Sequence, residues 1–211
     1  MLTPLDTSLY SNKIQLAKTP AGWIFLIFKN GSSTIASYCR ERNYKIYYAS
    51  EITDIDEVVV FIRNPIDRFK SGLQTVVHNL MRDNDHKLDS DTVAFMLQKY
   101  LFLDVHFLPQ FHWLLNLSSY IGNNVKLKLQ SIDDIDHLLL DNTRRIPEKS
   151  LTITINESNY TNLHLQLDEI LFNQIGNTLT FAEIVNLVKS DPDAKFDEII
   201  STPLNIAKVI F

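Results

Sequence analysis

Two apolar stretches of the chain end abruptly in polar residues. Residues 24–28 (Ile-Phe-Leu-Ile-Phe) and 58–62 (Val-Val-Val-Phe-Ile) are unbroken runs of β-favouring residues, and each leads through polar side chains into a helix-like pattern. A strand that is apolar on both faces is expected in the centre of a sheet that helices cover on both sides. In open α/β sheets, ligands bind beyond the carboxyl ends of the strands, where helix N-termini present free N–H groups. The pattern therefore predicts an α/β fold with a ligand site at these two strand ends.

The rest of the chain predicts further elements around these two strands. Strands are expected over residues 23–28, 45–49, 58–62, 125–129 and 151–155, with a short edge strand at 13–17. Helices are expected over residues 32–42, 65–81, 91–103, 108–120, 131–140, 163–175 and 180–189. Because there is no repeat, low-complexity tract or linker, residues 1–211 are predicted to form one domain. Its expected core is a short parallel sheet of four or five strands flanked by helices.

The polar segment after the first apolar run has the chemistry of a phosphate loop. It consists of Lys29, Asn30, Gly31, Ser32, Ser33 and Thr34. Hydroxyls and main-chain N–H groups at a helix N-terminus bind anions, and a glycine lets the backbone approach the ligand closely. The alternative is that the serines only cap the helix. A Walker-type loop is not indicated, because Gly-x4-Gly-Lys-Ser/Thr is absent.

The segment after the second apolar run offers a second anion site. Arg63 supplies a permanently charged planar donor group, and Ser71 adds a hydroxyl eight residues later. The two converge only if the chain leaves Arg63 outside the helix, which the proline two residues later favours. Arg68 is expected at the surface, paired with Asp67 or Asp56. A solvated helix start is the alternative interpretation. Together, the two strand ends predict a ligand with two separate phosphates.

These segments resemble those of the sulfotransferases that use 3′-phosphoadenosine 5′-phosphosulfate (PAPS), especially the carbohydrate-modifying branch. Residues 28–35 resemble the family's 5′-phosphosulfate loop, usually Pro-Lys-x-Gly-Ser/Thr-Ser/Thr, and residues 61–71 resemble its 3′-phosphate motif, an arginine followed eight positions later by a serine. Residues 106–110 (His-Phe-Leu-Pro-Gln) are similar to the His-Trp-x-Pro-Gln segment of that branch. The family's usual proline, aspartate and tryptophan are replaced by Phe28, Asn64 and Phe107. None of these departures removes a phosphate-binding group.

The resemblance implies a nucleotide-kinase-like (P-loop-like) fold, with PAPS as cofactor and adenosine 3′,5′-bisphosphate (PAP) as product. It implies that Lys29 reaches the bridging oxygen, that residues 29–34 hold the 5′-phosphate, and that Arg63 and Ser71 hold the 3′-phosphate. The implied reaction moves a sulfuryl group to a hydroxyl of a sugar, glycan or small metabolite. By analogy with phosphoryl transfer, positioning and charge stabilisation dominate such catalysis. Because the other basic residues are scattered along the chain, a neutral or weakly anionic acceptor is expected.

The general base is expected among side chains that titrate near neutral pH or that can accept a proton at the site. His106 is the first candidate, since it matches the histidine of the family segment, and its alternative role is to brace the nucleotide loop. His78 is the second, on the same predicted helix face as the serine of the 3′-phosphate motif. Further candidates are Glu51 and His112. Residues 156–158 (Asn-Glu-Ser) weakly resemble the segment that closes over the nucleotide in the carbohydrate branch.

Amino-acid composition limits the kinds of partner and the cellular compartment that are expected. The formal net charge of −5 disfavours nucleic acid as the main partner. A single cysteine, Cys39, cannot form an internal disulfide. The first 18 residues have no apolar stretch of signal-peptide length, and no segment approaches a membrane span. The sequence therefore predicts a soluble cytoplasmic enzyme without a membrane partner. Because the animal carbohydrate sulfotransferases that it resembles are usually anchored in the Golgi, the resemblance implies a microbial or viral enzyme. No metal is assigned, because sulfuryl transfer from PAPS needs none.

Two other functions stay open at this point. The same strand-loop-helix units would serve a small kinase or another nucleotide-dependent transferase. A nucleotide-binding module without turnover is the second alternative, and Lys29 argues against it because phosphate binding alone does not require a lysine at the transfer position. A chelator distinguishes a kinase from a sulfotransferase, since kinases need Mg²⁺ to bridge phosphates and sulfuryl transfer from PAPS does not.

Overall fold

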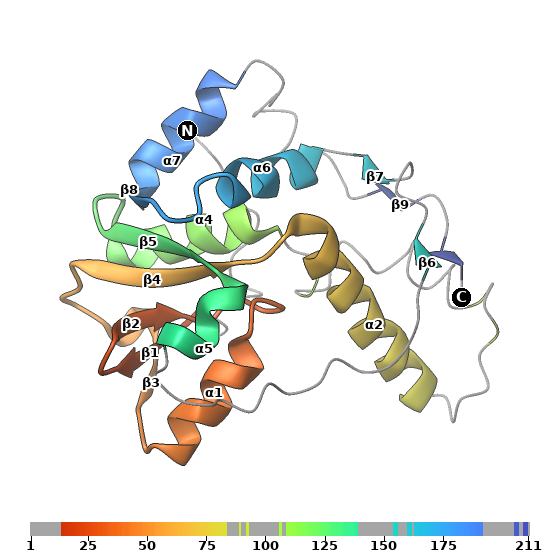
Figure 1. Cartoon of the computed structure of the whole chain (residues 1–211), viewed down its shortest axis with the longest axis horizontal. Helices are drawn as coiled ribbons and strands as arrows, with labels where there is room; N and C mark the ends of the chain where they lie inside the picture. The colour runs from red at the N-terminus through yellow and green to blue at the C-terminus, as the bar shows by residue number, and fades with distance from the viewer. Residues whose placement is uncertain are drawn as a thin grey trace.

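Helices cover both faces of an open, mixed β-sheet (Figure 1). The computed structural model describes residues 14–83, 89, 92, 106, 109–138, 154–155, 160–161, 163–191, 205–206 and 209–210. The predicted α/β class is confirmed. The helix expected over residues 91–103, apart from Thr92, and the segment 156–158 lie outside this set. None of the helices within the described ranges is long and apolar enough to cross a membrane.

The main sheet has six strands in the order β3-β1-β2-β4-β5-β8. They are β1 (Gln15–Thr19), β2 (Gly22–Phe25), β3 (Ile46–Tyr48), β4 (Glu57–Ile62), β5 (Lys126–Ser131) and β8 (Thr178–Thr180). β4 is parallel to both β2 and β5, whereas β1 is antiparallel to β2 and β3, and β8 is antiparallel to β5. The prediction of a parallel sheet is thus correct for the three central strands β2, β4 and β5 and wrong for the six-stranded sheet as a whole. Two further pairs join β6 (Thr154–Ile155) with β10 (Val209–Ile210) and β7 (Tyr160–Thr161) with β9 (Asn205–Ile206).

The first strand is an inner strand, not the edge strand predicted from the sequence. A tight turn joins β1 to β2, in which the Thr19 hydroxyl donates to the carbonyl of Gly22 at 3.0 Å and accepts from the N–H of Ala21 at 3.2 Å. A turn this short forces the two strands to run antiparallel. The other edge of β1 then pairs with β3, which becomes the edge of the sheet. Local turn chemistry therefore changed the topology that the apolar pattern alone suggested.

The helices follow most of the predicted ranges. They are α1 (Ser32–Glu41), α2 (Pro65–Asp83), α4 (Gln110–Ile121), α5 (Ile135–Leu138), α6 (Leu163–Phe172) and α7 (Phe181–Ser190), with 3-10 turns η3 (Ala49–Glu51) and η5 (Ile132–Asp134). The helix expected from Ser131 begins instead as the turn η5, because the Ser131 hydroxyl accepts from the N–H of Asp133 at 3.2 Å. α7 starts after a reciprocal capping box between Thr180 and Glu183.

The two faces of the sheet are covered by different helices (Figure 1). Val59 and Phe61 of β4 pack with α1 and α5, while the alternate residues of β4 pack with α4, α6 and α7. Every residue from Val58 to Ile62 is at most 3% exposed. This confirms that the second apolar run is a strand buried on both faces, as predicted.

The chain leaves the neighbouring strands β2 and β4 in different directions. β2 leads into α1, which covers one face, whereas β4 leads through α2 to α4 on the other face (Figure 1). The carboxyl ends of β2 and β4 therefore flank a topological switch point, where the two connections diverge to opposite faces of the sheet. Ligands of open α/β sheets bind at such points.

Candidate functional site

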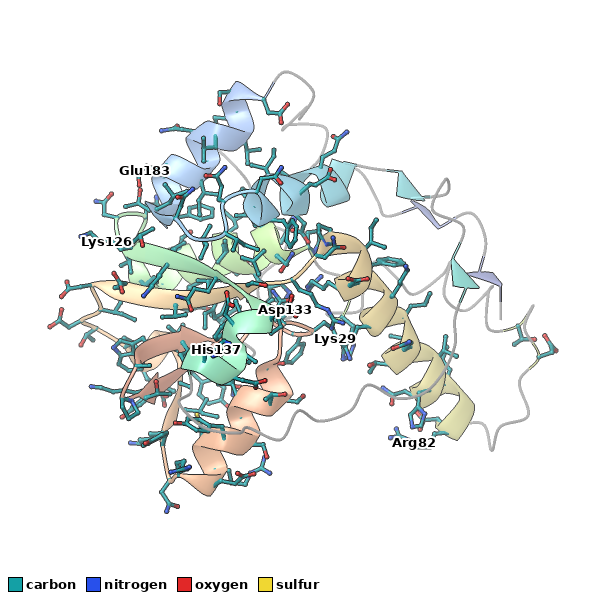
Figure 2. The ribbon with its side chains drawn as sticks, in the orientation of Figure 1. Lys29, Arg82, Lys126, Asp133, His137 and Glu183 are labelled. Carbon is teal, nitrogen blue, oxygen red and sulfur yellow. The ribbon has the colours of Figure 1, made fainter. Side chains whose placement is uncertain are left out.

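A cavity of about 880 Å³ lies beyond the carboxyl ends of β2, β4 and β5. Figure 2 shows Lys29 and Asp133 at this end of the sheet, and Lys126 at the opposite end of β5. The residues that line it come from the β2–α1 loop and the start of α1, from the β4–α2 connection and α2, and from the end of β5 with η5 and α5, together with His106 and Phe172. They are Phe28, Lys29, Gly31, Ser32, Ser33, Thr34, Arg63, Asn64, Asp67, Ser71, Gln74, Thr75, His106, Ser131, Ile132, Asp133, Ile135 and Phe172. The structure thus brings both predicted phosphate motifs to one cavity.

The β2–α1 loop has a backbone that few side chains tolerate. Lys29 has φ 70° and Gly31 has φ 75°, so both lie in the left-handed region. A Cβ atom on Gly31 would come within 2.7 Å of the Ile132 side chain and 2.9 Å of the Ile135 side chain. Glycine is therefore required here by conformation and by space. The left-handed backbone at Lys29 costs free energy, which surrounding contacts must offset.

The serines of this loop do not cap α1. Gly31 is the N-cap residue, and no side chain accepts a hydrogen bond at the start of the helix. Ser32, Ser33 and Thr34 instead line the cavity in the first turn, where main-chain N–H groups have no partner within the helix. The capping alternative is therefore wrong, and the first turn of α1 offers N–H groups and hydroxyls to an anion.

Lys29 reaches across the cavity to the second helix. Its Nζ donates a hydrogen bond to Oγ1 of Thr75, whose hydroxyl donates in turn to the carbonyl of Ser71 at 3.2 Å. The ammonium group is thus held beside the hydroxyl-bearing face of α2. Thr75 was missed in the sequence, although it lies one helical turn beyond Ser71 and so on the same face.

The β4–α2 connection presents Arg63 and Ser71 to the same cavity. α2 begins at Pro65, so Arg63 and Asn64 precede the helix as predicted. The Asn64 side chain accepts from the N–H groups of Ile66 at 3.0 Å and Asp67 at 3.2 Å. Asparagine therefore caps α2 where the family usually has aspartate. The guanidinium of Arg63 donates through Nη1 to the carbonyl of Lys29 at 3.2 Å, which connects the two motifs directly.

Asn30 lies beneath the cavity and not at its surface. It is 1% exposed, and its N–H donates to the carbonyl of Ile27 at 3.1 Å. Its Nδ2 donates to the carbonyl of Phe61 at 2.7 Å and to Oε1 of Gln110. The position of Asn30 therefore does not favour the predicted contact with a cofactor. It ties the end of β2 to β4 at a point where the strand ladder between them has already stopped at Phe25.

Arg68 is buried, which corrects the prediction of a surface ion pair. Its side chain is 3% exposed, and it donates through Nε to Oδ1 of Asn30 at 3.1 Å and through Nη2 to the carbonyl of Phe28 at 3.1 Å. Burial lowers the pKa of Arg68 to about 10, and the nearby Asp168 carboxylate opposes that shift. Burial likewise raises the pKa of Asp168, against the attraction of Arg68. A buried charge of this kind needs a partner and hydrogen bonds.

Gln110 and Asp168 complete a buried network with Asn30 and Arg68. Gln110 is fully buried; its Oε1 accepts from the N–H of Arg63 at 2.9 Å, and its Nε2 donates to the carbonyl of Arg63 at 3.0 Å. Asp168 accepts from the N–H groups of Gln110 at 3.0 Å and Phe111 at 3.1 Å, at the start of α4. We call these four residues (Asn30, Arg68, Gln110 and Asp168) the buried network. Gln110 belongs to a recognised segment, but no signal in the sequence marks Asp168.

The four candidate bases lie at different places relative to the cavity. His106 lines the cavity, and its ring stacks on Phe28 with 5.8 Å between centroids and 20° between planes. His78 lies in α2, three residues beyond Thr75, and is not among the lining residues. His112 is 2% exposed in α4, and the Glu51 carboxylate accepts from the N–H of Tyr48 at 2.8 Å. Of the four, His106 alone borders the cavity among the described residues.

The cavity combines two cations with two carboxylates. Lys29 and Arg63 lie with Asp67 and Asp133 among its lining residues, and Asp133 belongs to η5, which follows β5. Within the described ranges, no group of three or more His, Cys, Asp or Glu residues is arranged to hold a metal ion. The cations sit beside hydroxyls and a helix N-terminus, which is chemistry suited to phosphate or sulfate. No protein-family model, curated protein or solved structure matches the chain.

Proposed function

We propose that this protein is a sulfotransferase that moves a sulfuryl group from PAPS to a hydroxyl of a sugar, glycan or small metabolite and releases PAP. The observation that carries the proposal is the convergence of two anion-binding motifs on one cavity at a topological switch point. Lys29 and Ser32 come from the end of β2, and Arg63 and Ser71 from the end of β4 and from α2. Two such groups suit a nucleotide with phosphates at both its 5′ and 3′ positions.

The proposed reaction assigns a role to each side of the cavity. The first turn of α1 holds the 5′-phosphate, while Arg63 and Ser71 hold the 3′-phosphate. The acceptor oxygen forms a bond to sulfur as the bond from sulfur to the 5′-phosphate oxygen breaks, and the electron pair stays on that oxygen. Lys29 stabilises the negative charge that develops there. The proton of the acceptor hydroxyl passes to a base, for which His106 is the best-placed histidine.

The two carboxylates of the cavity affect which acceptor can bind. Asp67 and Asp133, which line the cavity together with Lys29 and Arg63, would repel a polyanionic polymer. This supports a neutral or weakly anionic acceptor. Sulfation of neutral and polyanionic glycans, compared at low and moderate salt, shows which of the two kinds of acceptor the enzyme prefers. A polyanion preference that disappears steeply with salt would contradict this part of the proposal.

A thermal-shift comparison of nucleotides tests the proposal first. PAP should raise the melting temperature more than ADP or adenosine 5′-monophosphate, because a ligand that binds only the folded state stabilises it in proportion to its affinity. The two poorer ligands leave Arg63 and Ser71 without a 3′-phosphate. Equal shifts for all three nucleotides would contradict a two-phosphate site.

One feature of the cavity favours a second candidate, a small nucleotide-dependent kinase. The carboxylate of Asp133, in η5 after β5, is a suitable Mg²⁺ ligand beside a phosphate site. The two enzymes differ in their need for metal. Transfer of labelled sulfate from PAPS should persist in excess EDTA, whereas transfer of phosphate from ATP should stop. A protein that binds PAP tightly and transfers neither group would be a binding module without turnover.

A further inference from the structure

The end of β4 is held by a side chain in place of a strand. On the β2 side, the ladder stops at Val60, while Arg63 lies beyond the strand itself. The carboxamide of Gln110 donates to the carbonyl of Arg63 at 3.0 Å and accepts from its N–H at 2.9 Å. It thus pairs with both main-chain groups of Arg63, as a neighbouring strand would. The backbone from which the Arg63 guanidinium extends is fixed by this pair of bonds.

The same carboxamide is bound to the other motif. Its Oε1 also accepts from Nδ2 of Asn30, which follows Lys29 directly in the β2–α1 loop. One fully buried side chain therefore contacts the connection that carries Arg63 and the loop that carries Lys29. Its own position is set from behind, because Asp168 accepts from the N–H of Gln110 at 3.0 Å.

We propose that Gln110 is a positioning residue that sets the spacing between the two phosphate-binding motifs. It does not line the cavity and so does not touch the ligand. A ligand with two phosphates gains affinity only where both groups meet their partners at once, so fixed spacing removes an ordering cost from binding. A ligand with one phosphate needs one motif only and is insensitive to the spacing. The inference rests on the proposed function, since it concerns the same two-phosphate site.

Calorimetric titrations of the full chain with three probes test this role. The probes are PAP, adenosine 5′-monophosphate and adenosine 3′-monophosphate, and the variant is Gln110→Met, which keeps the length of the side chain but removes its polar atoms. We expect PAP affinity to fall about tenfold or more while affinity for each monophosphate changes by less than about twofold. Equal losses for all three probes, or no loss for PAP, would overturn the inference.

A core variant supplies the matched control for lost stability. Ile184 is fully buried in α7, belongs to the core cluster that includes residues of α4, and does not line the cavity. Ile184→Ala should lower the melting temperature and leave the affinity for all three probes unchanged. If it weakened PAP binding as selectively as Gln110→Met does, reduced stability would explain both results and the inference would fail.

Gln110→Glu provides a second test if the methionine variant does not fold. A protonated glutamic acid reproduces the donor and the acceptor of the amide, whereas its ionised form places an oxygen without hydrogen against the carbonyl of Arg63. Among the described residues, Asp168 from α6 accepts from the N–H of Gln110, and Arg63 is a hydrogen-bond partner of its side chain. Arg68 from α2 interacts electrostatically with both Asp168 and Arg63. Wild type contains the same three charged groups. The ratio of the PAP affinity of Gln110→Glu to that of wild type therefore reports the effect of the new carboxyl group alone.

We expect Gln110→Glu to bind PAP nearly as well as wild type at low pH and progressively worse as pH rises, with no such trend for adenosine 5′-monophosphate. A ratio that stays constant with pH would overturn the positioning role. Failure of the underlying function gives a different result: wild type itself would bind PAP no more tightly than the monophosphates. That outcome would overturn the proposed function and this inference together. If wild type binds PAP more tightly than the monophosphates but the Gln110 variants weaken all three probes equally, only the inference is overturned.

Discussion

Arg63 and Arg68 lie five residues apart on one connection, yet one lines the cavity and the other is buried beneath it. Lys29 and Asn30 differ in the same way at the end of β2, although they are adjacent. In each pair, one residue lines the cavity that is proposed to bind the ligand. Its counterpart donates or accepts hydrogen bonds within the buried network. The two motifs therefore contain both the groups that suit a ligand and the groups that hold them in place.

The difference shows that a polar motif is not uniformly a binding motif. A buried polar group without a partner costs free energy, so the network residues must all be satisfied by one another or by the main chain. The cavity residues are free of that requirement, because a ligand or water can bind them. Substitutions in the network should thus reduce stability, and substitutions at the cavity should reduce binding or turnover with little loss of stability.

The largest effect is expected from Arg68→Ala. This change leaves the buried Oδ1 of Asn30 and the carbonyl of Phe28 without the donor that each has in wild type, and a buried polar group left unsatisfied costs about 1–3 kcal/mol in the free energy of unfolding. It also removes the positive charge that opposes the rise in the pKa of Asp168. Urea unfolding measures the loss. The same substitution at Arg63 is the control, and it should cost about 1 kcal/mol, the value of one hydrogen bond. Equal losses at the two arginines would contradict the division between network and cavity.

Lys29→Ala should affect chemistry more than binding. The charge that Lys29 is proposed to stabilise appears in the transition state, so turnover should fall by about 10²–10³ while PAP affinity falls much less. Steady-state rates with labelled PAPS, together with calorimetry of PAP binding, measure the two quantities. If both fell by the same factor, Lys29 would be only an anchor for the nucleotide.

Gly31→Ala should cost about 1–3 kcal/mol of stability, because the new Cβ meets the side chains of Ile132 and Ile135 and the backbone has φ 75°. Thermal unfolding of Gly31→Ala and of wild type measures the loss. An unchanged melting temperature would show that neither the contacts nor the backbone conformation at Gly31 is limiting.

The smallest effect is expected at an exposed polar group far from the cavity. Glu183 lies at the opposite end of the sheet (Figure 2), and hydrogen bonds from the N–H and hydroxyl of Thr180 lower the pKa of its carboxyl group. The depressed pKa means that this contribution to stability is present above the unfolded-state pKa and is lost as pH falls through the folded-state value. Glu183→Gln should slightly reduce the acid dependence of the melting temperature. An unchanged pH profile would show that the cap does not contribute.

The local parts of this architecture could be predicted from sequence. The apolar runs located β2 and β4, and the proline at position 65 located the start of α2. Gly31 was singled out because glycine lets the backbone approach a ligand closely, and the structure adds that its φ of 75° also favours glycine. Each of these inferences depends on residues that are neighbours in the chain, where period and turn chemistry act directly.

The buried network could not be predicted, because its bonds join residues that are far apart in the chain. Gln110 binds Arg63 across 47 residues and Asp168 across 58. An arginine followed by helical residues is most often exposed, so Arg68 was expected at the surface beside Asp67. β8, with three residues, is too short to show a period, and among the described strands it pairs with β5. Spatial neighbours, which local patterns do not encode, decide such positions.

The central claim is that the cavity holds one phosphate at each strand end, and calorimetry of PAP with wild type and Arg63→Ala tests it most directly. The account predicts that Arg63→Ala weakens PAP binding by about 1.5–3 kcal/mol, the scale of a charged hydrogen bond, and leaves adenosine 5′-monophosphate binding unchanged. The 5′-monophosphate is the internal reference, since it engages only the end of β2. Equal weakening of both nucleotides, or no weakening of either, would contradict the claim.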